Sequence, residues 1–452
     1  MQQTELFDSL HEASYYHSAT GQGFFSLLVQ DQYGAKKQQS YRLSQMAQII
    51  PLLDQHRDTW ISQAEFWQPN RRVVNLARIG LLFADLDTYH CPAMIGRTPE
   101  QQAAALNFYC DDEGIPRPSL IIYSGRGLQA KWLLQTALPR AAMPRWKAVQ
   151  TALNQRLSNF GSDRNAMDAS RVLRLVNTVN TKSGEIARLV DVNGSSDPEV
   201  YDFDYLADEL LPLTRMQIEQ QREQRKVAKA ARLQLAYASQ TSKQNERFGH
   251  FKSLNSRTLA WHRLEDIRTL GDLRGGWAEG SRDKSLFWQM NFLALAGAVH
   301  EQNLAKEAQE LAKIVYGSRV GEYEPSSVGT LIEKARLYAQ GADIEFHGKR
   351  YPALYTPRNS TLIDIFEITT EEQRQLRTIL DKREAQRRDT ASQEARRREQ
   401  GVKPIAEHFE QRKADAMSLK AQIRELDSQG LLASQIAKQL GCSRATVHHA
   451  LK

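Results

Sequence analysis

Residues 77–90 read ARIGLLFADLDTYH, an apolar run that ends in two aspartates, Asp85 and Asp87. The apolar run predicts a buried strand that closes in a polar turn. Because side chains two residues apart on a strand share a face, both carboxylates lie on one side, with Cβ atoms about 6–7 Å apart. The pair therefore either ends a strand in an ordinary polar turn or holds hard cations, which prefer oxygen ligands.

A second stretch, YSGRGLQAKWLL (123–134), places polar and basic side chains after the next predicted strand. Its small-residue turn contains Ser124 and Arg126, and the strand that follows presents Gln129 and Lys131 on one face. Such a group can receive phosphates through backbone N–H groups and cationic side chains. It is not a Walker A loop, because no GxxxxGK(S/T) sequence occurs in the chain. The alternative is a tight hairpin without a ligand.

A third stretch, GSDRNAMDASRVLRLVNTVNTKSG (161–184), adds another carboxylate, Asp163, ahead of basic and amide side chains. Carboxylates around two cations about 3.5–4 Å apart are typical of polymerases and nucleases. The stretch predicts an anionic ligand near such metals, and the alternative is a surface cluster of ion pairs. The side chains that follow Asp163 are Asp168, Arg171, Arg174, Asn177, Asn180 and Lys182.

Strand-like and helix-like segments alternate over residues 1–212, which predicts an α/β domain with a mixed sheet rather than a regular parallel wind. Residues 213–247 lack Gly and Pro and predict a charged, partly helical linker. Residues 248–343 predict a helical domain, and residues 344–418 a basic, largely helical segment. Within the first domain we expect strands at 24–31, 39–43, 77–87, 118–125, 128–135 and 186–192, and helices at 44–56, 99–112 and 144–160.

The last segment, residues 419–452, alternates helical stretches with Gly430 and Gly441 and predicts a helix-turn-helix. In such a motif the last helix enters the major groove of DNA, and the alternative is a small helical bundle for protein contacts. We expect Ser434 and Ser443 to cap its second and third helices. The expected inner side chains are Ile436, Ala437, Leu440, Val447 and Leu451, and those expected to face DNA are Ser443, Arg444, Thr446 and His448.

Composition limits the class of protein. The net charge is +7, from 60 Lys and Arg against 53 Asp and Glu, and basic residues crowd 215–232 and 373–413. A basic stripe is typical of a phosphate-backbone binder, although a solvated helix with internal ion pairs has the same composition. Three scattered cysteines exclude a disulfide scaffold and fit a reducing cytoplasm. No apolar run approaches the roughly 20 residues of a membrane span, and the N-terminus lacks a signal-peptide pattern. We therefore expect a cytoplasmic protein with no membrane partner.

Together, the D-x-D strand, the small-residue turn and the segment from Asp163 to Lys182 resemble the archaeo-eukaryotic primase superfamily, most closely its plasmid replication primases. The resemblance covers roughly residues 20–195. It implies an α+β fold, with an RRM-like primase core built on a mixed sheet and followed by all-α domains and the helix-turn-helix. It also implies that Asp85, Asp87 and Asp163 are the catalytic acids and hold Mg²⁺ or Mn²⁺.

The activity implied by the resemblance is primer synthesis on single-stranded DNA from nucleoside triphosphates, by two-metal nucleotidyl transfer. The protein would serve the replication of a plasmid or similar mobile element, and its helix-turn-helix would bind double-stranded DNA. Because the chain has no P-loop, helicase activity would come from a separate replicative helicase. The expected nucleotide contacts are Ser124, Arg126, Gln129, Lys131, Arg174, Asn180 and Lys182.

The sequence departs from the family pattern at two places. The second motif often reads Ser-x-His, whereas here no His follows Ser124 and Gln129 occupies the comparable strand. The third motif usually ends in RLPGTxN, and here Asn177 stands in place of the glycine, so we expect it to adopt a positive φ.

These departures leave two alternatives to a primase. The main one is a non-catalytic origin-binding or regulatory protein with a degenerate primase fold, and the other is a metal-dependent nuclease that uses the same carboxylates. A tyrosine recombinase is disfavoured because His262-Arg263 lacks the HxxR spacing. A relaxase is disfavoured because no His-hydrophobic-His motif is present.

Overall fold

The structure is a computed structural model that describes residues 7–163, 166–194, 197–212, 220, 249–346, 349–399, 401 and 405–452. Its contacts divide the chain into two units. The first comprises Met1–Glu367 with Gln375–Ile379, and the second comprises Ile368–Arg374 with Leu380–Lys452. Apart from residue 220, the linker predicted over 213–247 lies outside the described residues.

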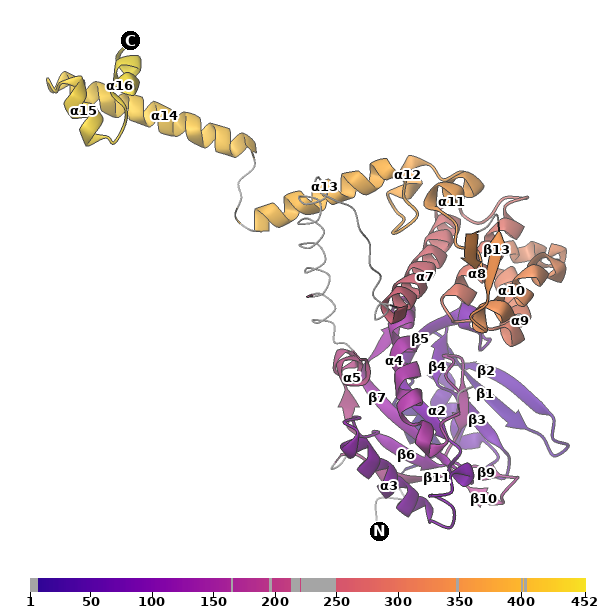
Figure 1. Ribbon diagram of the computed structural model, residues 1–452. Coiled ribbons are helices and arrows are strands. Elements are labelled where there is room, and N and C mark those ends of the chain that lie inside the picture. The colour runs from indigo at the N-terminus through magenta and orange to yellow at the C-terminus, as the bar shows by residue number, and fades with distance from the viewer. Residues whose placement is uncertain are drawn as a thin grey trace. The chain divides into compact units, whose positions relative to one another are not determined.

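A ten-stranded sheet is the centre of the first unit (Figure 1). Its order is β11-β6-β7-β5-β4-β1-β3-β8, with β2 beside β1 and β12 beside β7. Among the described strands of this sheet only β12 pairs in parallel, so the predicted mixed sheet is confirmed but is almost wholly antiparallel. The strands are β1 (Phe24–Gln30), β2 (Lys36–Arg42), β3 (Thr59–Ser62), β4 (Ala64–Phe66), β5 (Leu76–Leu86), β6 (Leu120–Tyr123), β7 (Leu128–Pro139), β8 (Val172–Arg174), β11 (Arg188–Val192) and β12 (Val200–Tyr201).

The strand predicted from ARIGLLFADLD is β5, the longest partner of β7. It is buried on both faces over most of its length, which explains why its sequence is continuously apolar rather than alternating. Asp85 is its second-last residue, and Asp87 follows directly after it. The strand therefore carries both acids to one end of the central pair. A separate two-stranded ladder joins β9 (Val179–Asn180) to β10 (Glu185–Ile186).

Two of the helices that the sequence predicts form and pack against strands of the sheet. The segment 99–112 forms α3 (Pro99–Asp112), which Thr98 caps together with Gln101. The segment 144–160 forms α4 (Met143–Arg156) and a short 3₁₀ turn, η6 (Ser158–Phe160). The helix predicted over 44–56 is too long, because only the single-turn helix α2 (Met46–Ile49) forms there, between 3₁₀ turns at 43–45 and 50–52, and Pro51 cannot continue it. The other helices of this part are α1 (Ser9–Ser14) and α5 (Phe203–Leu210).

The predicted helical region follows within the same unit. Its helices are α7 (Gly249–Leu273), α8 (Arg282–Leu295), α9 (Glu301–Tyr316) and α10 (Gly329–Ala339). In this unit α7 packs on α4, and α9 packs on the 3₁₀ turn η3 (Val73–Asn75) just ahead of β5. A hairpin of β13 (Asp343–Phe346) and β14 (Lys349–Pro352) then precedes α11 (Asn359–Phe366). The sequence, read as largely helical from residue 344, did not indicate this hairpin.

The basic segment predicted over 344–418 contains several separate helices. In the second unit these are α12 (Thr370–Gln373), α13 (Lys382–Glu399) and the start of α14 (Ile405–Ser428). None of the helices in the described residues is both long and apolar enough to cross a membrane.

The end of the second unit is a small three-helix cluster of α14, α15 (Ala433–Gln439) and α16 (Arg444–Leu451). Ser443 caps α16 as predicted, since its Oγ accepts the Thr446 N–H at 3.1 Å. The predicted Ser434 cap is wrong, because α15 begins one residue earlier, at Ala433. Leu451, predicted to point inward, is 36% exposed. The buried side chains of the cluster are Ile423, Ile436, Ala437, Val447 and Ala450, with Leu440 partly buried against them.

Candidate active site at the end of the central strand

Side chains of α4 complete one edge of β5. Strand β4 pairs only with the first residues of β5, so the backbone groups further along need other partners. The indole N–H of Trp146 donates to the carbonyl of Leu81 at 3.0 Å. The amide of Gln150, one turn later, accepts the Phe83 N–H at 3.2 Å and donates to the Phe83 carbonyl at 2.5 Å. Helix α4 thus takes the place of a missing strand.

Further along the strand, residues 161–163 bring the third acid to the first two. The N–H of Asp163 donates to the carbonyl of Asp85, and the N–H of Asp87 donates to the carbonyl of Gly161, both at 2.9 Å. Gly161 has φ 71°, and a Cβ there would lie 2.8 Å from the Asp87 carbonyl oxygen, so this contact needs glycine. Asn154 of α4 donates to the Asp163 carbonyl at 3.2 Å. The structure therefore brings Asp163 beside the strand end that carries Asp85 and Asp87.

Burial and the neighbouring charges perturb the carboxyl group of Asp85. Burial raises the pKa of Asp85 to about 6, against the neighbouring Arg171, and the charges of Asp87 and Asp163 raise it further. Arg171 Nη2 lies 3.1 Å from Asp163 Oδ2 and 3.9 Å from Asp85 Oδ2. One guanidinium thus supplies positive charge to two of the three acids. Arg171 was noted in the sequence only as part of a basic cluster.

These acids offer the oxygen ligands that Mg²⁺ and Mn²⁺ prefer. As the side chains lie, however, no three carboxylate, imidazole or thiol groups of the described residues are placed to hold one metal ion. The guanidinium of Arg171 lies against Asp163 and faces Asp85. The chemistry of the donor set therefore fits a divalent cation, provided that Arg171 yields its place on the carboxylates.

The turn after β6 lies against the end of β5. The Ser124 N–H donates to the Gly127 carbonyl at 2.9 Å, and a Cβ on Gly127 would lie 2.2 Å from the carbonyl oxygen of Leu86. Between them Arg126 is exposed, and its guanidinium carbon lies 4.1 Å from the ring centroid of Tyr89. Burial and a hydrogen bond to Asp87 raise the pKa of Tyr89. Tyr89 thus joins Arg126 to the acids, a role that its place two residues after Asp87 could have suggested.

The third motif reaches the same turn. Asn180 Nδ2 donates to the Ser124 carbonyl at 2.9 Å, and the N–H of Lys182 donates to Asn180 Oδ1 at 3.2 Å. The side chain of Lys182 is exposed. Asn177 has φ 60°, which confirms the expected positive φ. Ser124, Arg126, Asn180 and Lys182 therefore form a rim beside the acids.

Lys131 does not reach that rim. It is fully buried, and its Nζ lies 2.5 Å from Glu12 Oε1. Burial lowers the pKa of Lys131, and Glu12 opposes that shift. Glu12 in turn accepts the Val176 N–H at 2.9 Å. A phosphate has no access to Lys131, which instead ties β7 to α1 and to the residues after β8.

Gln129 and Arg174 are also committed to the fold. Gln129 is 3% exposed, and with its amide oxygen toward the Arg174 N–H it makes two 3.1 Å bonds to the Arg174 backbone. The Arg174 side chain pairs with Asp58 at 2.5 Å and donates to the Val179 carbonyl at 3.0 Å. Sequence spacing could not reveal this, because Glu12 and Asp58, which pair with Lys131 and Arg174, lie far away in the chain.

In the second unit, the four side chains expected to face DNA lie on the exposed side of α16. Arg444, Thr446 and His448 are exposed, and Ser443 lies at the helix start. The hydroxyl of Ser443 is engaged with Thr446, both through the cap and through a 2.8 Å contact with its Oγ1. Arg444 and His448 therefore offer the freer polar groups.

Comparison with known proteins agrees with the resemblance drawn from the motifs. No family model matches the chain. A curated relative described as "Replication protein", from Clostridium perfringens, is 27% identical over 326 residues, which is 72% of this chain and 68% of the relative.

Solved primase structures are similar at a lower level. A cyanophage S-2L primase-polymerase domain matches at 17% identity and a TM-score of 0.33, covering 45% of this chain and 97% of that one. The primase RepB′ matches at 17% identity and a TM-score of 0.29, covering 74% of this chain and 99% of that one.

Proposed function

We propose that this chain is a DNA replication protein of a plasmid or similar mobile element, whose first unit synthesises primers on single-stranded DNA. The observation that carries the proposal is the pairing of residues 161–163 with the end of β5, which gathers Asp85, Asp87 and Asp163. The motif resemblance to primases and the 27% identity to a replication protein support the same setting.

In this proposal the three acids would hold Mg²⁺ or Mn²⁺. Bound there, the cations would lower the pKa of the attacking 3′-hydroxyl and offset the charge of the leaving pyrophosphate. The exposed Arg126 and Lys182 would bind the triphosphate, and Ser124 and Asn180 would keep the turn beneath it in place. The buried Gln129, Lys131 and Arg174 would support the sheet rather than touch the nucleotide.

The second unit would bind double-stranded DNA through α16, which carries Arg444, Thr446 and His448 and is capped by Ser443. It would locate an origin or secure the template. Since the sequence contains no P-loop, a separate replicative helicase would open the duplex.

A non-catalytic origin-binding protein with the same fold is the second candidate. One observation favours it: Arg171 is paired with Asp163 and lies near Asp85, which is the place that a cation would need. A nuclease that uses the same carboxylates is the third class to be separated.

One incubation separates the three. The whole protein is mixed with labelled nucleoside triphosphates, single-stranded DNA and Mn²⁺ or Mg²⁺, and the products are resolved by length. The Asp85→Ala variant is compared with Asp112→Ala, which removes an exposed carboxylate at the end of α3. The primase is supported if oligonucleotides form with wild type and Asp112→Ala but not with Asp85→Ala. DNA binding without synthesis would support the second candidate, and shortened DNA the nuclease.

A further inference from the structure

The 70–75 loop, which leads directly into β5, is held by two glutamates of α9. Glu307 is 1% exposed, and its carboxylate accepts the backbone N–H groups of Val73 at 3.2 Å and Val74 at 3.1 Å. Glu310, one turn further along α9, accepts the side-chain amides of Asn70 at 2.7 Å and Asn75 at 2.9 Å. The helical region therefore binds the middle and both ends of this loop.

The carbonyl side of the same loop is held by two arginines. Arg140, which follows β7, donates to the carbonyls of Val73 at 3.1 Å and Val74 at 3.0 Å. Arg268 of α7 also donates to the Val74 carbonyl, at 3.2 Å. Because buried backbone groups are costly to leave unpaired, the contacts from Arg268 and Glu307 stabilise this position of the loop when the helical region is docked, beside those from Arg140.

From its other side the loop contacts the segment that carries Arg171. The guanidinium of Arg71 donates to the carbonyl of Ser170, while its Nε donates to Gln38 Oε1 at 3.1 Å. That carbonyl belongs to the peptide group that joins Ser170 to Arg171. Arg171 is the residue whose side chain pairs with Asp163. The loop therefore contacts the peptide group directly before the arginine that pairs with Asp163.

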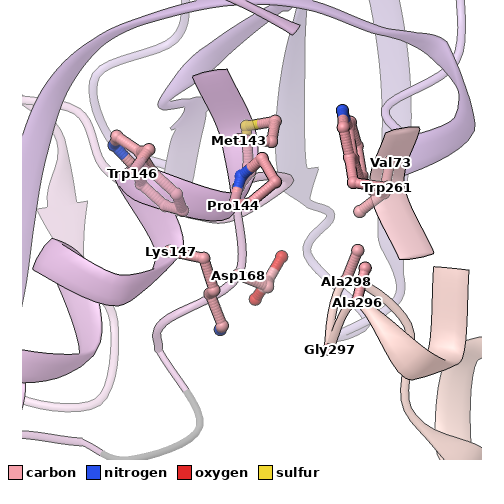
Figure 2. A pocket seen from close by; sticks show the side chains of 11 residues that line it. Val73, Met143, Pro144, Trp146, Lys147, Asp168, Trp261, Ala296, Gly297 and Ala298 are labelled. Carbon is pink, nitrogen blue, oxygen red and sulfur yellow. The ribbon is translucent and has the colours of Figure 1, made fainter. Parts of the chain in front are cut away.

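The space between these parts is nearly filled. A cavity of about 20 Å³ is lined by Val73 of the loop, Lys147 of α4, Asp168 of the segment before Arg171, and Trp261 of α7 (Figure 2). This is room for about one water molecule. Val73 of the loop and Asp168 of the segment before Arg171 therefore line the same small space, which is a second place where the two lie close together.

We infer that Arg71 is a positioning residue for the acidic site and that Glu307 and Glu310 of α9 set its place. Docking of the helical region thereby determines where Arg171 lies relative to Asp85 and Asp163. The consequence for catalysis rests on the proposed function. The coupling between α9 and the residues around Arg171 does not.

The test compares Glu307→Gln with Asp266→Asn in the whole protein. Asp266 is a matched control because it is also a buried carboxylate of the helical region, 3% exposed. Its carboxylate accepts the backbone N–H groups of Arg377, Thr378 and Ile379, away from the 70–75 loop. Each variant alters a buried carboxylate that accepts backbone N–H groups. Only Glu307→Gln acts on the 70–75 loop, which contacts the segment of Arg171.

Amide hydrogen exchange over residues 166–175 is the first readout. We expect exchange to be at least several-fold faster there in Glu307→Gln and in Arg71→Ala, and unchanged in Asp266→Asn. Arg71→Lys, which keeps the charge but not the fork of donors, should fall between wild type and Arg71→Ala. If Glu307→Gln does not fold, Glu310→Gln and Arg71→Ala carry the test. Equal exchange in all variants, or equal acceleration by Asp266→Asn, would overturn the coupling.

Mn²⁺ affinity, measured from the signal of free Mn²⁺, is the second readout. We expect Arg71→Ala and Glu307→Gln to bind Mn²⁺ several-fold more tightly than wild type, because Arg171 then competes less well for the acids. Unchanged affinity in both would overturn this part. Neither readout requires synthesis, so a wild-type protein that makes no primers would refute the proposed function while leaving the positioning role to be judged by exchange and Mn²⁺ binding.

Discussion

At the scale of single residues, Asp85 combines its proposed chemical role with a cost to the stability of the fold. Its pKa is raised from 3.8 to about 6, chiefly by burial. The folded state therefore binds this proton more tightly than the unfolded state, and the free energy of unfolding falls as pH rises from about 4 to about 6. Above pH 6 the whole cost is present.

We predict that Asp85→Asn raises the free energy of unfolding by about 1–2 kcal/mol at pH 7.5 in chelator-treated buffer, after allowance for partial exposure of the side chain. Below about pH 3 the gain should disappear, because the wild-type carboxyl is then neutral in both states. Urea unfolding at the two pH values measures this. If the variant is no more stable than wild type at pH 7.5, then burial of the ionised Asp85 carboxylate does not lower the free energy of unfolding.

Residue-level predictions from the sequence succeeded where the chemistry was local. Asn177 takes the positive φ expected of its place in the third motif, and the backbone of Asp163 pairs with that of Asp85 at the end of β5. They failed where a partner lies far along the chain. The residues near Lys131 in the sequence do not indicate that it forms a buried ion pair with Glu12, because that pairing depends on how α1 packs against β7.

At the scale of elements, α4 acts as a substitute strand for β5. Its Gln150 pairs with both backbone groups of Phe83. We predict that Gln150→Leu lowers the free energy of unfolding by about 2–4 kcal/mol, because two buried polar groups lose their partner. Chemical denaturation checks this against Gln155→Leu, an exposed position of the same helix that should change stability little. Similar losses in the two variants would contradict this role of α4.

The turn between β6 and β7 makes a second close approach to β5. A Cβ on Gly127 would meet the Leu86 carbonyl oxygen at 2.2 Å, whereas one on Gly329, at the start of α10, would meet nothing within 4 Å. We predict that Gly127→Ala displaces the turn and lowers thermal stability by several degrees, and that Gly329→Ala leaves it unchanged or slightly raised. Equal melting temperatures for Gly127→Ala and wild type would show that the turn can move away freely.

The long apolar or amphipathic elements β5, α3 and α4 were predictable because their patterns are local. The short strands β3, β4 and β8 were missed. A strand of three or four residues carries little periodicity, and these are defined mainly by their neighbours in the sheet.

At the scale of the whole molecule, composition separates residues 1–212 from residues 248–343, whereas contacts place both in the first unit. Buried side chains of α7 and α9 connect them through the 70–75 loop. Such contacts join residues more than 190 positions apart, so no sequence period could indicate them. The helices at the end of the second unit agree more closely with the sequence prediction, because local residues mark their ends: Gly430, Gly441 and Ser443.

The central claim is that the three gathered carboxylates perform metal-dependent nucleotidyl transfer. Its most direct test is the rate at which wild type, Asp163→Asn and Asp112→Asn incorporate a labelled nucleotide opposite a single-stranded template in Mn²⁺. We predict incorporation by wild type and Asp112→Asn, and a loss of roughly a hundredfold or more in Asp163→Asn, because that carboxylate is needed to hold the cations. Incorporation by Asp163→Asn at the wild-type rate, or none by wild type itself, would contradict the account.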